Sequence, residues 1–199
     1  MVNCVNGSRK GSAFERDVCK RLSLWFSKNT SETLFWRTAG SGARSTSRAK
    51  SGKSTANSAG DIGYLDAAGK PLIEAITFEL KCGYSKADTT SLIDTLPSRK
   101  KPQLLEFIRQ AVESGRNAQS KYWSVIHRRN SKQTLIHFPF SMWELICRYD
   151  QYTTDAMAKR CGSVQFTYVP VTDDLVSCVV SMPFDRFLEV VYPDTFFEF

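Results

Sequence analysis

Three residues whose side chains could do chemistry lie within one short part of the sequence. The run "ITFELK" (76–81) places Glu79 and Lys81 two residues apart, and Asp61 stands upstream at the start of another apolar run. Successive side chains of a strand alternate between its two faces, so Glu79 and Lys81 point the same way and their neighbours point the other way. A buried strand is normally apolar on both faces. A carboxylate and an ammonium on one face therefore indicate a candidate functional site.

Two carboxylates and one amine suit the hydrolysis of a phosphate ester. Asp61 and Glu79 can hold Mg²⁺, with Mn²⁺ as a substitute, because these ions prefer oxygen ligands. A metal held in this way polarises a phosphoryl oxygen and lowers the pKa of a bound water. Lys81 can orient that water, accept its proton or stabilise the transition state, and the sequence does not separate these roles. Glu15 could reach the same centre and complete the ligand set.

Other readings of these residues stay open. Asp66 and Glu74 compete as the second acid, and we favour Glu79 because Glu74 is out of phase with the face that carries Lys81. Glu79 and Lys81 could instead form a solvated charge pattern on an edge strand. Asp61 alone could be an ordinary turn residue.

The first helix is expected at residues 11–28. Ser12 is a candidate N-cap with Glu15 three residues later, the pattern of a capping box. At about 100° per residue the helix has an apolar face, formed by Phe14, Val18, Leu22 and Trp25. Glu15 falls in the same inward sector, so it is either a site residue or only the second half of the capping box.

The remaining pattern predicts a mixed α/β protein. We expect a second helix at 102–115, starting at Pro102 and ending at Gly115. Strands are expected at 33–37, 61–66, 72–82, 122–128 and 134–138, with the turn "AAGKP" joining the second and third of them. Alternating strands and helices of this kind indicate a central sheet flanked by helices.

The residues after Pro139 continue with a helix, two strands and a short helix: "FSMWELICRYDQY", "VQFTYVP", "LVSCVVSM" and "FDRFLEVVY". No repeat and no linker separates them from the preceding part. We therefore predict a core at 1–139 and a C-terminal α/β extension at 140–199 that packs on the core and is not an independent domain.

Positive charge is concentrated in the first two thirds of the 199 residues, and the protein as a whole has a net charge of +7. The segment 37–53 has five cations and no acid, and it is rich in Gly and Ser: Arg37, Arg44, Arg48, Lys50 and Lys53. These cations are expected to bind DNA phosphates, because neutralising phosphates releases counterions. Residues 38–60 are predicted to form a long loop, which in a compact domain is usually functional or disordered. The alternative for 37–53 is an inert flexible loop.

Several classes of protein are disfavoured. No apolar run has the roughly 18–20 residues that a membrane span needs, and the N-terminus lacks the apolar stretch of a secretory signal. The six cysteines form no CxxC pair, which argues against a zinc site and a disulfide framework and favours packed, reduced thiols. We expect an intracellular, cytoplasmic protein (in the host cytoplasm if viral), with His127 and His137 as surface or interface residues.

The ordered residues resemble the PD-(D/E)xK nuclease superfamily, and more narrowly the archaeal-type Holliday junction resolvases and their viral relatives. Glu15, Asp61-Ile62, Glu79 and Lys81 match that pattern in order, and "PQLLEFIRQAVESG" followed by "YWSVIH" resembles the helix and strand that come next. The resemblance covers residues 11 to about 130 and is absent from 140–199. Gly60 stands where the family has proline, and the distance from the first strand to Asp61 is unusually long.

The resemblance implies the restriction-endonuclease-like fold, with a mixed central sheet flanked by helices. It also implies a magnesium-dependent DNA endonuclease that acts on branched DNA as a homodimer. It assigns Asp61 and Glu79 as metal ligands and Lys81 as the group that assists the attacking water. Glu15 is then either a third ligand or a residue that supports the ligands without contacting the metal. The C-terminal extension is then a candidate dimer surface or an added sheet layer. Alternatives are a restriction, repair or mobile-element nuclease acting on linear or single-stranded DNA, a non-catalytic DNA-binding module of this fold, and an RNA nuclease.

Overall fold

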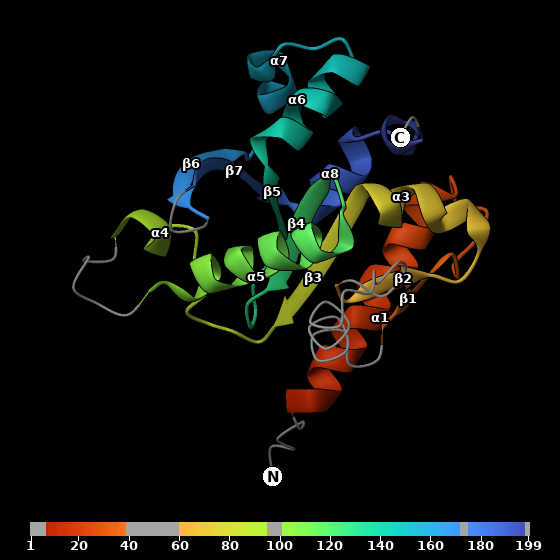
Figure 1. Ribbon diagram of the computed structural model, residues 1–199, viewed down its shortest axis with the longest axis horizontal. Coiled ribbons are helices and arrows are strands. Elements are labelled where there is room, and N and C mark those ends of the chain that lie inside the picture. Colours follow the sequence, from red (N-terminus) through yellow and green to blue (C-terminus); the bar gives the residue numbers. More distant parts are fainter. Residues whose placement is uncertain (1–6, 39–59, 95–100, 172–174, 198–199) are drawn as a thin grey trace.

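The computed structural model describes residues 7–38, 60–94, 101–171 and 175–197, and it has a mixed five-stranded sheet with helices on both faces (Figure 1). The helices are α1 (Gly7–Phe26), η1 (Ala67–Gly69), α3 (Lys70–Ala75), α4 (Ser91–Asp94), α5 (Gln103–Ala118), α6 (Phe140–Tyr149), α7 (Thr154–Cys161), α8 (Phe184–Val190) and η2 (Pro193–Phe196). The strands are β1 (Phe35–Arg37), β2 (Ile62–Tyr64), β3 (Ile76–Cys82), β4 (Tyr122–Arg128), β5 (Thr134–Pro139), β6 (Gln165–Pro170) and β7 (Val176–Pro183). The predicted fold class is confirmed.

The main sheet has the strand order β3-β4-β5-β7-β6. β3 and β4 are parallel, and α5 makes the crossover between them, as a parallel pair requires. The other neighbouring pairs are antiparallel. β1 and β2 form a separate antiparallel ribbon beside the free edge of β3, where Asp61 N–H donates to the carbonyl of Phe78 (2.7 Å).

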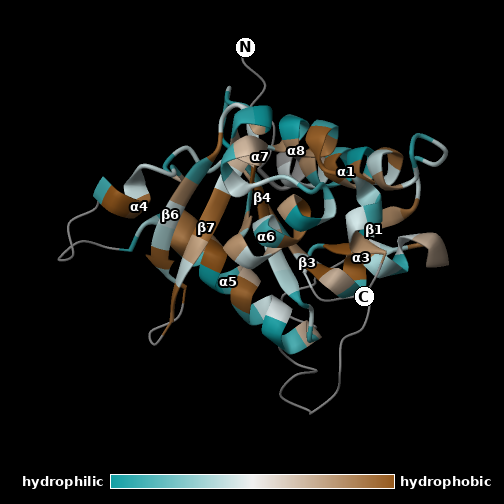
Figure 2. Ribbon diagram, turned by 90° about the horizontal axis from the view of Figure 1, so that it is seen from above, coloured by the Kyte–Doolittle hydropathy of each residue, from teal (hydrophilic) through white to brown (hydrophobic). Residues whose placement is uncertain are grey.

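Two apolar cores lie on opposite faces of this sheet. The larger one joins α1, α3, α6 and α8 to side chains such as Phe78 and Leu80 of β3. The smaller one lies under α5 and includes Trp123 and Val125 of β4. Hydrophilic and hydrophobic residues lie side by side along α1 and α5 (Figure 2), as expected for helices that bury one face. Glu79 and Lys81 therefore belong to the α5 face of β3.

The prediction for 72–82 is wrong in its first part. Residues 70–75 form the short helix α3, with Pro71 at its start, and the strand begins only at Ile76. The apolar run 72–76 is too short for periodicity to separate a buried helix from a buried strand. β2 and β3 are therefore not the two arms of a hairpin.

The expected helix boundaries also need correction. α1 begins at Gly7, so Ser12 lies inside the helix and cannot be the N-cap of a capping box with Glu15. α5 passes through Gly115 and ends at Ala118, where Gln119 adopts the left-handed conformation (φ 59°). Gly115 is buried within the helix beside Trp123 of β4 and is not its C-terminal residue. Helix α7 was not predicted.

The residues after Pro139 contribute to the same sheet. β7 pairs with β5, and β6 pairs with β7 at the outer edge. The helix at the start of this part, both strands and α8 were predicted correctly. The division into a core and an extension that is not an independent domain stays a prediction.

The five described cysteines are free thiols. Cys19, Cys147 and Cys161 are buried, as predicted, and Cys82 and Cys178 are partly buried. Among the residues that the structure describes, no helix has both the length and the hydrophobicity needed to cross a membrane.

Candidate active site

Glu79 and Lys81 form a buried ion pair on β3. The Lys81 ammonium donates a hydrogen bond to Glu79 Oε1 at 2.6 Å, and the two side chains are 16% and 4% exposed. The ammonium also lies 5.5 Å from the centroid of the Phe107 ring on α5. A solvated charge pattern on an edge strand is therefore the wrong interpretation of these residues.

Asp61 is held at the edge of β3 by its main chain and its side chain. Its N–H donates to the Phe78 carbonyl, and its Oδ2 accepts a hydrogen bond from the Leu80 N–H (2.8 Å). Thr38 N–H donates to the Asp61 carbonyl at 2.9 Å. Asp61 thus lies beside Glu79, because its main-chain N–H binds the residue before Glu79 and its carboxylate binds the residue after it.

Gly60 is required for this approach. It has φ +75°, and a Cβ at this position would lie 2.4 Å from the Phe78 carbonyl oxygen. An L-residue is strained at that φ and would collide with the main chain of β3. The glycine that stands where the wider family has proline therefore has a structural reason: it lets Asp61 reach the strand.

The electrostatics of the site favour a bound cation. The pKa of the Glu79 carboxyl is raised to about 7. Burial is the largest cause, the Asp61 charge and a hydrogen bond that protonated Glu79 donates to Asp61 act in the same direction, and Lys81 offsets them in part. Two neighbouring carboxylates with little water around one of them repel each other. A divalent cation would remove this repulsion, and Mg²⁺ characteristically uses one or two carboxylates together with water and phosphate oxygens. Asp61 and Glu79 therefore fit such an ion.

Glu15 does not form one cluster with Asp61 and Glu79. Its Oε2 lies 3.1 Å from Nη1 of Arg37, the last residue of β1. Within the described ranges, no group of three or more His, Cys, Asp or Glu side chains is arranged to hold a metal. The reason is packing: α1 covers the Phe78 face of β3, whereas Glu79 lies on the α5 face.

Glu15 nevertheless lies in the same neighbourhood. The pKa of the Cys19 thiol is raised to about 12, chiefly by burial and also by the negative charges of Glu15 and Asp61. Both carboxylates therefore act on one buried thiol. This placement is compatible with Glu15 supporting the two carboxylates without contacting the metal. That Glu15 is itself a metal ligand stays a prediction.

The two competing acids have other roles. Asp66 Oδ1 accepts a hydrogen bond from the Ala68 N–H (2.8 Å) and caps the short helix η1. Glu74 lies on α3, where its carboxylate is 3.4 Å from the Lys70 ammonium. The choice of Glu79 over these residues agrees with the geometry of the site.

Of the five cations expected to bind phosphates, only Arg37 lies within the described part of the chain. Its guanidinium lies beside Glu15 and 3.4 Å from the Ser12 hydroxyl. The other four, Arg44, Arg48, Lys50 and Lys53, lie outside the described residues.

The expectation that both histidines are surface or interface residues is wrong, because both are almost completely buried. His127 Nε2 lies 3.0 Å from the Ala87 carbonyl, His127 Nδ1 lies 2.8 Å from His137 Nε2, and His137 Nδ1 lies 2.8 Å from the Ser181 hydroxyl. A carbonyl only accepts, so His127 Nε2 carries a proton, His137 Nε2 donates to His127, and the Ser181 hydroxyl donates to His137. We call these three residues the histidine row.

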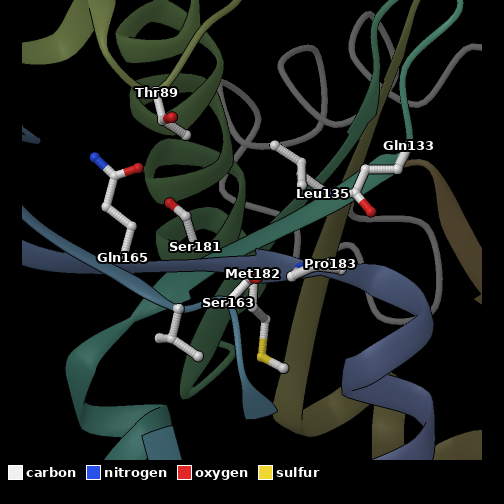
Figure 3. A pocket seen from close by; sticks show the side chains of 9 residues that line it. Thr89, Gln133, Leu135, Ser163, Gln165, Ser181, Met182 and Pro183 are labelled. Carbon is white, nitrogen blue, oxygen red and sulfur yellow. The ribbon is translucent and has the colours of Figure 1, made fainter. Parts of the chain in front are cut away.

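Burial lowers the pKa of both histidines, and it lowers that of His137 well below the usual value. The row ends at Ser181, which lines a hollow of about 240 Å³ together with Thr89 and Gln165 (Figure 3). The sequence contained one indication of this burial: His127 and His137 both lie within segments predicted to be strands and not in turns. Their pairing depends on strand register, which periodicity does not supply.

Comparison with known proteins gives one match. Residues 6–198 match the family described as "Phage putative PDDEXK endonuclease". A search of the curated proteins and a search of the solved structures each found no match. The match includes 140–198, where no resemblance was expected from the sequence. The chain therefore belongs to this phage family of the PD-(D/E)xK superfamily, whose members are nucleases of the phosphodiester hydrolase class.

Proposed function

We propose that this protein is a magnesium-dependent DNA endonuclease whose active site is formed by Asp61, Glu79 and Lys81. The observation that carries the proposal is the pair of adjacent carboxylates on the edge of β3, with an ammonium hydrogen-bonded to one of them. A non-catalytic module of the same fold would have no need to keep this costly arrangement of buried charges.

The roles of the side chains follow from their contacts. Asp61 and Glu79 would hold the metal, which when bound polarises the scissile phosphate and acidifies a water. Lys81 holds Glu79 in one orientation through its hydrogen bond and places a positive charge where the transition state gains negative charge. The main-chain N–H of Leu80 fixes the Asp61 carboxylate in the same way.

The test compares Asp61→Asn and Lys81→Ala with Asp66→Asn and Lys70→Ala, which change the same residue types away from the site. Initial cleavage rates of duplex and single-stranded DNA are measured with Mg²⁺ and with EDTA, and DNA binding is measured in Ca²⁺. We expect the two site variants to lose Mg²⁺-dependent cleavage and keep binding, while the two controls keep both. Full cleavage by both site variants would end the catalytic assignment.

We further propose that the preferred substrate is branched DNA. The support is the resemblance of Glu15, Asp61, Glu79 and Lys81, in this order, to the resolvase pattern. A panel of four-way junction, flap, duplex and single strand at equal concentration tests it. Faster cleavage of the junction supports the proposal, and equal or faster cleavage of linear duplex favours a restriction or repair-type nuclease.

We also propose a homodimer, because two symmetric cuts in a junction need two active sites. Edge strand β6 exposes Phe166 and Tyr168, and the neighbouring end of β7 exposes Val176. Light scattering after gel filtration measures the mass, and Tyr168→Lys should convert a dimer to a monomer. A wild-type mass of one chain would contradict this proposal without affecting the catalytic one.

The cations of 37–53 are proposed to bind DNA phosphates. Each neutralised phosphate contributes to the salt dependence of binding. Replacing Arg44 and Arg48 by Ala should therefore lower the slope of log affinity against log salt by about two. An unchanged slope would mean that these two residues do not contact phosphates.

A further inference from the structure

A second feature lies directly beside the candidate active site. It is a hollow of about 510 Å³ between α1 and β1, and its lining includes Arg16, Cys19, Glu32, Trp36, Arg37 and Leu65. This volume is within the range of small-molecule and cofactor sites, roughly 300–1,000 Å³. None of the active-site roles proposed above uses Arg16, Trp36 or Leu65. We call it the α1–β1 hollow.

The hollow has an exposed aromatic residue in its wall. Trp36 is 38% exposed, and its cross-strand partner in the β1–β2 ribbon is Gly63, which has no side chain to cover it. Leu65, two residues further along the same side of that ribbon, is 65% exposed. Facing pairs are what normally cover side chains on a sheet surface. The ribbon thus presents an uncovered apolar surface at this place.

The charges around this apolar surface are mainly positive. Three cations, Arg16, Lys20 and Arg37, line the hollow with a single carboxylate, Glu32. The carboxylate is paired with Lys20 at 2.8 Å on the surface. Arg16 and Lys20 are one helical turn apart on α1, so their side chains lie on one face of the helix.

The hollow also borders the candidate catalytic residues. Arg37 lies in its wall, contacts Glu15 and pairs across the ribbon with Ile62, the residue after Asp61. The next residue, Thr38, donates its N–H to the Asp61 carbonyl. A group bound here would therefore be joined to the reacting phosphate by a short length of polymer rather than lie at a remote site.

We propose that the α1–β1 hollow binds an unstacked nucleotide of the DNA substrate, with its base against Trp36 and its phosphate near Arg16 and Arg37. This inference rests on the proposed function. An exposed aromatic face beside cations is the arrangement that binds single-stranded nucleic acid, because any base can stack and any phosphate can pair with a cation. A duplex offers no free base face to Trp36, so the hollow selects unpaired DNA.

Binding of a short single-stranded oligodeoxynucleotide in EDTA tests the proposal. Trp36→Ala should weaken this binding by about 5- to 100-fold, the range expected for one lost stacking contact. Trp36→Phe should retain most of the affinity, because it keeps an aromatic face. Tyr149→Ala, which removes another partly exposed aromatic side chain on α6, is the matched control and should bind like the wild type. Duplex binding should change less than threefold in every variant.

Fluorescence gives a second readout that does not depend on the stability of Trp36→Ala. Stacking of a base should quench the wild-type tryptophan emission, and this quenching should be lost in Trp36→Phe although the oligonucleotide still binds. Arg16→Ala should lower the salt slope by about one, whereas Lys159→Ala on α7 should not. Unchanged single-strand affinity in Trp36→Ala and Arg16→Ala, or equal losses for single strand and duplex, would overturn the proposal.

The result of this binding test can be distinguished from the result of the test of the proposed catalytic function. All binding measurements use no Mg²⁺ and can be repeated in Asp61→Asn, where cleavage is expected to be absent and binding intact. If Asp61→Asn cleaves normally, the catalytic assignment fails while the Trp36 result stands. If Trp36→Ala binds single strands normally, the hollow fails as a nucleotide site while the catalytic assignment stands.

Discussion

The two buried polar clusters of this protein lie on the same face of the sheet and differ in how their charges are balanced. Glu79 pairs across the sheet with Val125, which pairs with His137, which pairs with Ser181. In the histidine row each donor meets an acceptor, and both rings stay neutral because burial lowers their pKa. At Glu79 and Asp61 two carboxylates meet and a single lysine offsets them in part. A closed set of hydrogen bonds suits a structural role, and an unbalanced set of charges suits a site that awaits a ligand.

The two clusters also give stability opposite dependences on pH. Glu79 has a raised pKa in the folded protein, so its contribution to stability is complete below about pH 4.5 and is lost as the pH rises to about 7. The histidines have lowered pKa values in the folded protein, so their contribution is complete above about pH 6.5 and is lost as the pH falls. The following predictions test this contrast.

The largest expected effect is on catalysis. Glu79→Gln should lower the Mg²⁺-dependent cleavage rate by at least about 100-fold, because it removes one of two metal ligands and a metal supplies several kcal/mol of transition-state stabilisation. Single-turnover cleavage of a labelled DNA measures it. His137→Phe is the comparison, and its cleavage rate per folded molecule should stay within about threefold of the wild type. Equal losses in both variants would remove the distinction between the clusters.

The next effect is on stability without metal. Between pH 5 and pH 8 in EDTA, wild-type stability should fall relative to Glu79→Gln by roughly 2–3 kcal/mol, since the Glu79 pKa is about 7 in the folded protein against an ordinary value of 4.5. Urea unfolding at a series of pH values gives the difference. Mg²⁺ at pH 8 should restore stability to the wild type and not to the variant. A difference that does not change with pH would show that Glu79 ionises normally.

A smaller loss is expected in the histidine row. His137→Phe leaves His127 Nδ1 and the Ser181 hydroxyl without their partner inside the core, at a cost of about 1–3 kcal/mol. The measurement is the urea midpoint at pH 8. Ile136→Val, a neighbouring residue that faces the other core, is a control for general disturbance and should cost about 1 kcal/mol. If the histidine variant is as stable as the wild type, the row does not contribute to folding.

The smallest effect is expected at the end of the row. Ser181→Ala removes only the hydroxyl that donates to His137 Nδ1, so the loss should be about 1 kcal/mol at pH 8. Thermal unfolding at pH 8 and at pH 5.5 compares it with His137→Phe. Greater destabilisation by Ser181→Ala than by His137→Phe would contradict the proton assignment along the row.

Much of the site could be predicted from local pattern. The alternation of a strand was enough to place Glu79 and Lys81 on one face, and the spacing of apolar residues was enough to place the helices at 103–118 and 140–149. The short helix at 70–75 was missed because a segment of six residues is too short for its pattern to separate a helix from a strand. Glu15 was placed correctly on a helix, but its distance from Glu79 depends on which face of the sheet that helix covers.

The order of Asp61, Glu79 and Lys81, their residue types and the faces of their strands are properties of the sequence by itself, because side-chain alternation and turn chemistry act within a few residues. Three features were decided only by the tertiary structure: the approach of Asp61 to β3 over Gly60, the pairing of Glu15 with Arg37, and the burial of His127 against His137. Each of them joins segments that are separate along the chain. Such contacts depend on how sheet and helices pack, and local sequence patterns carry no information about that packing.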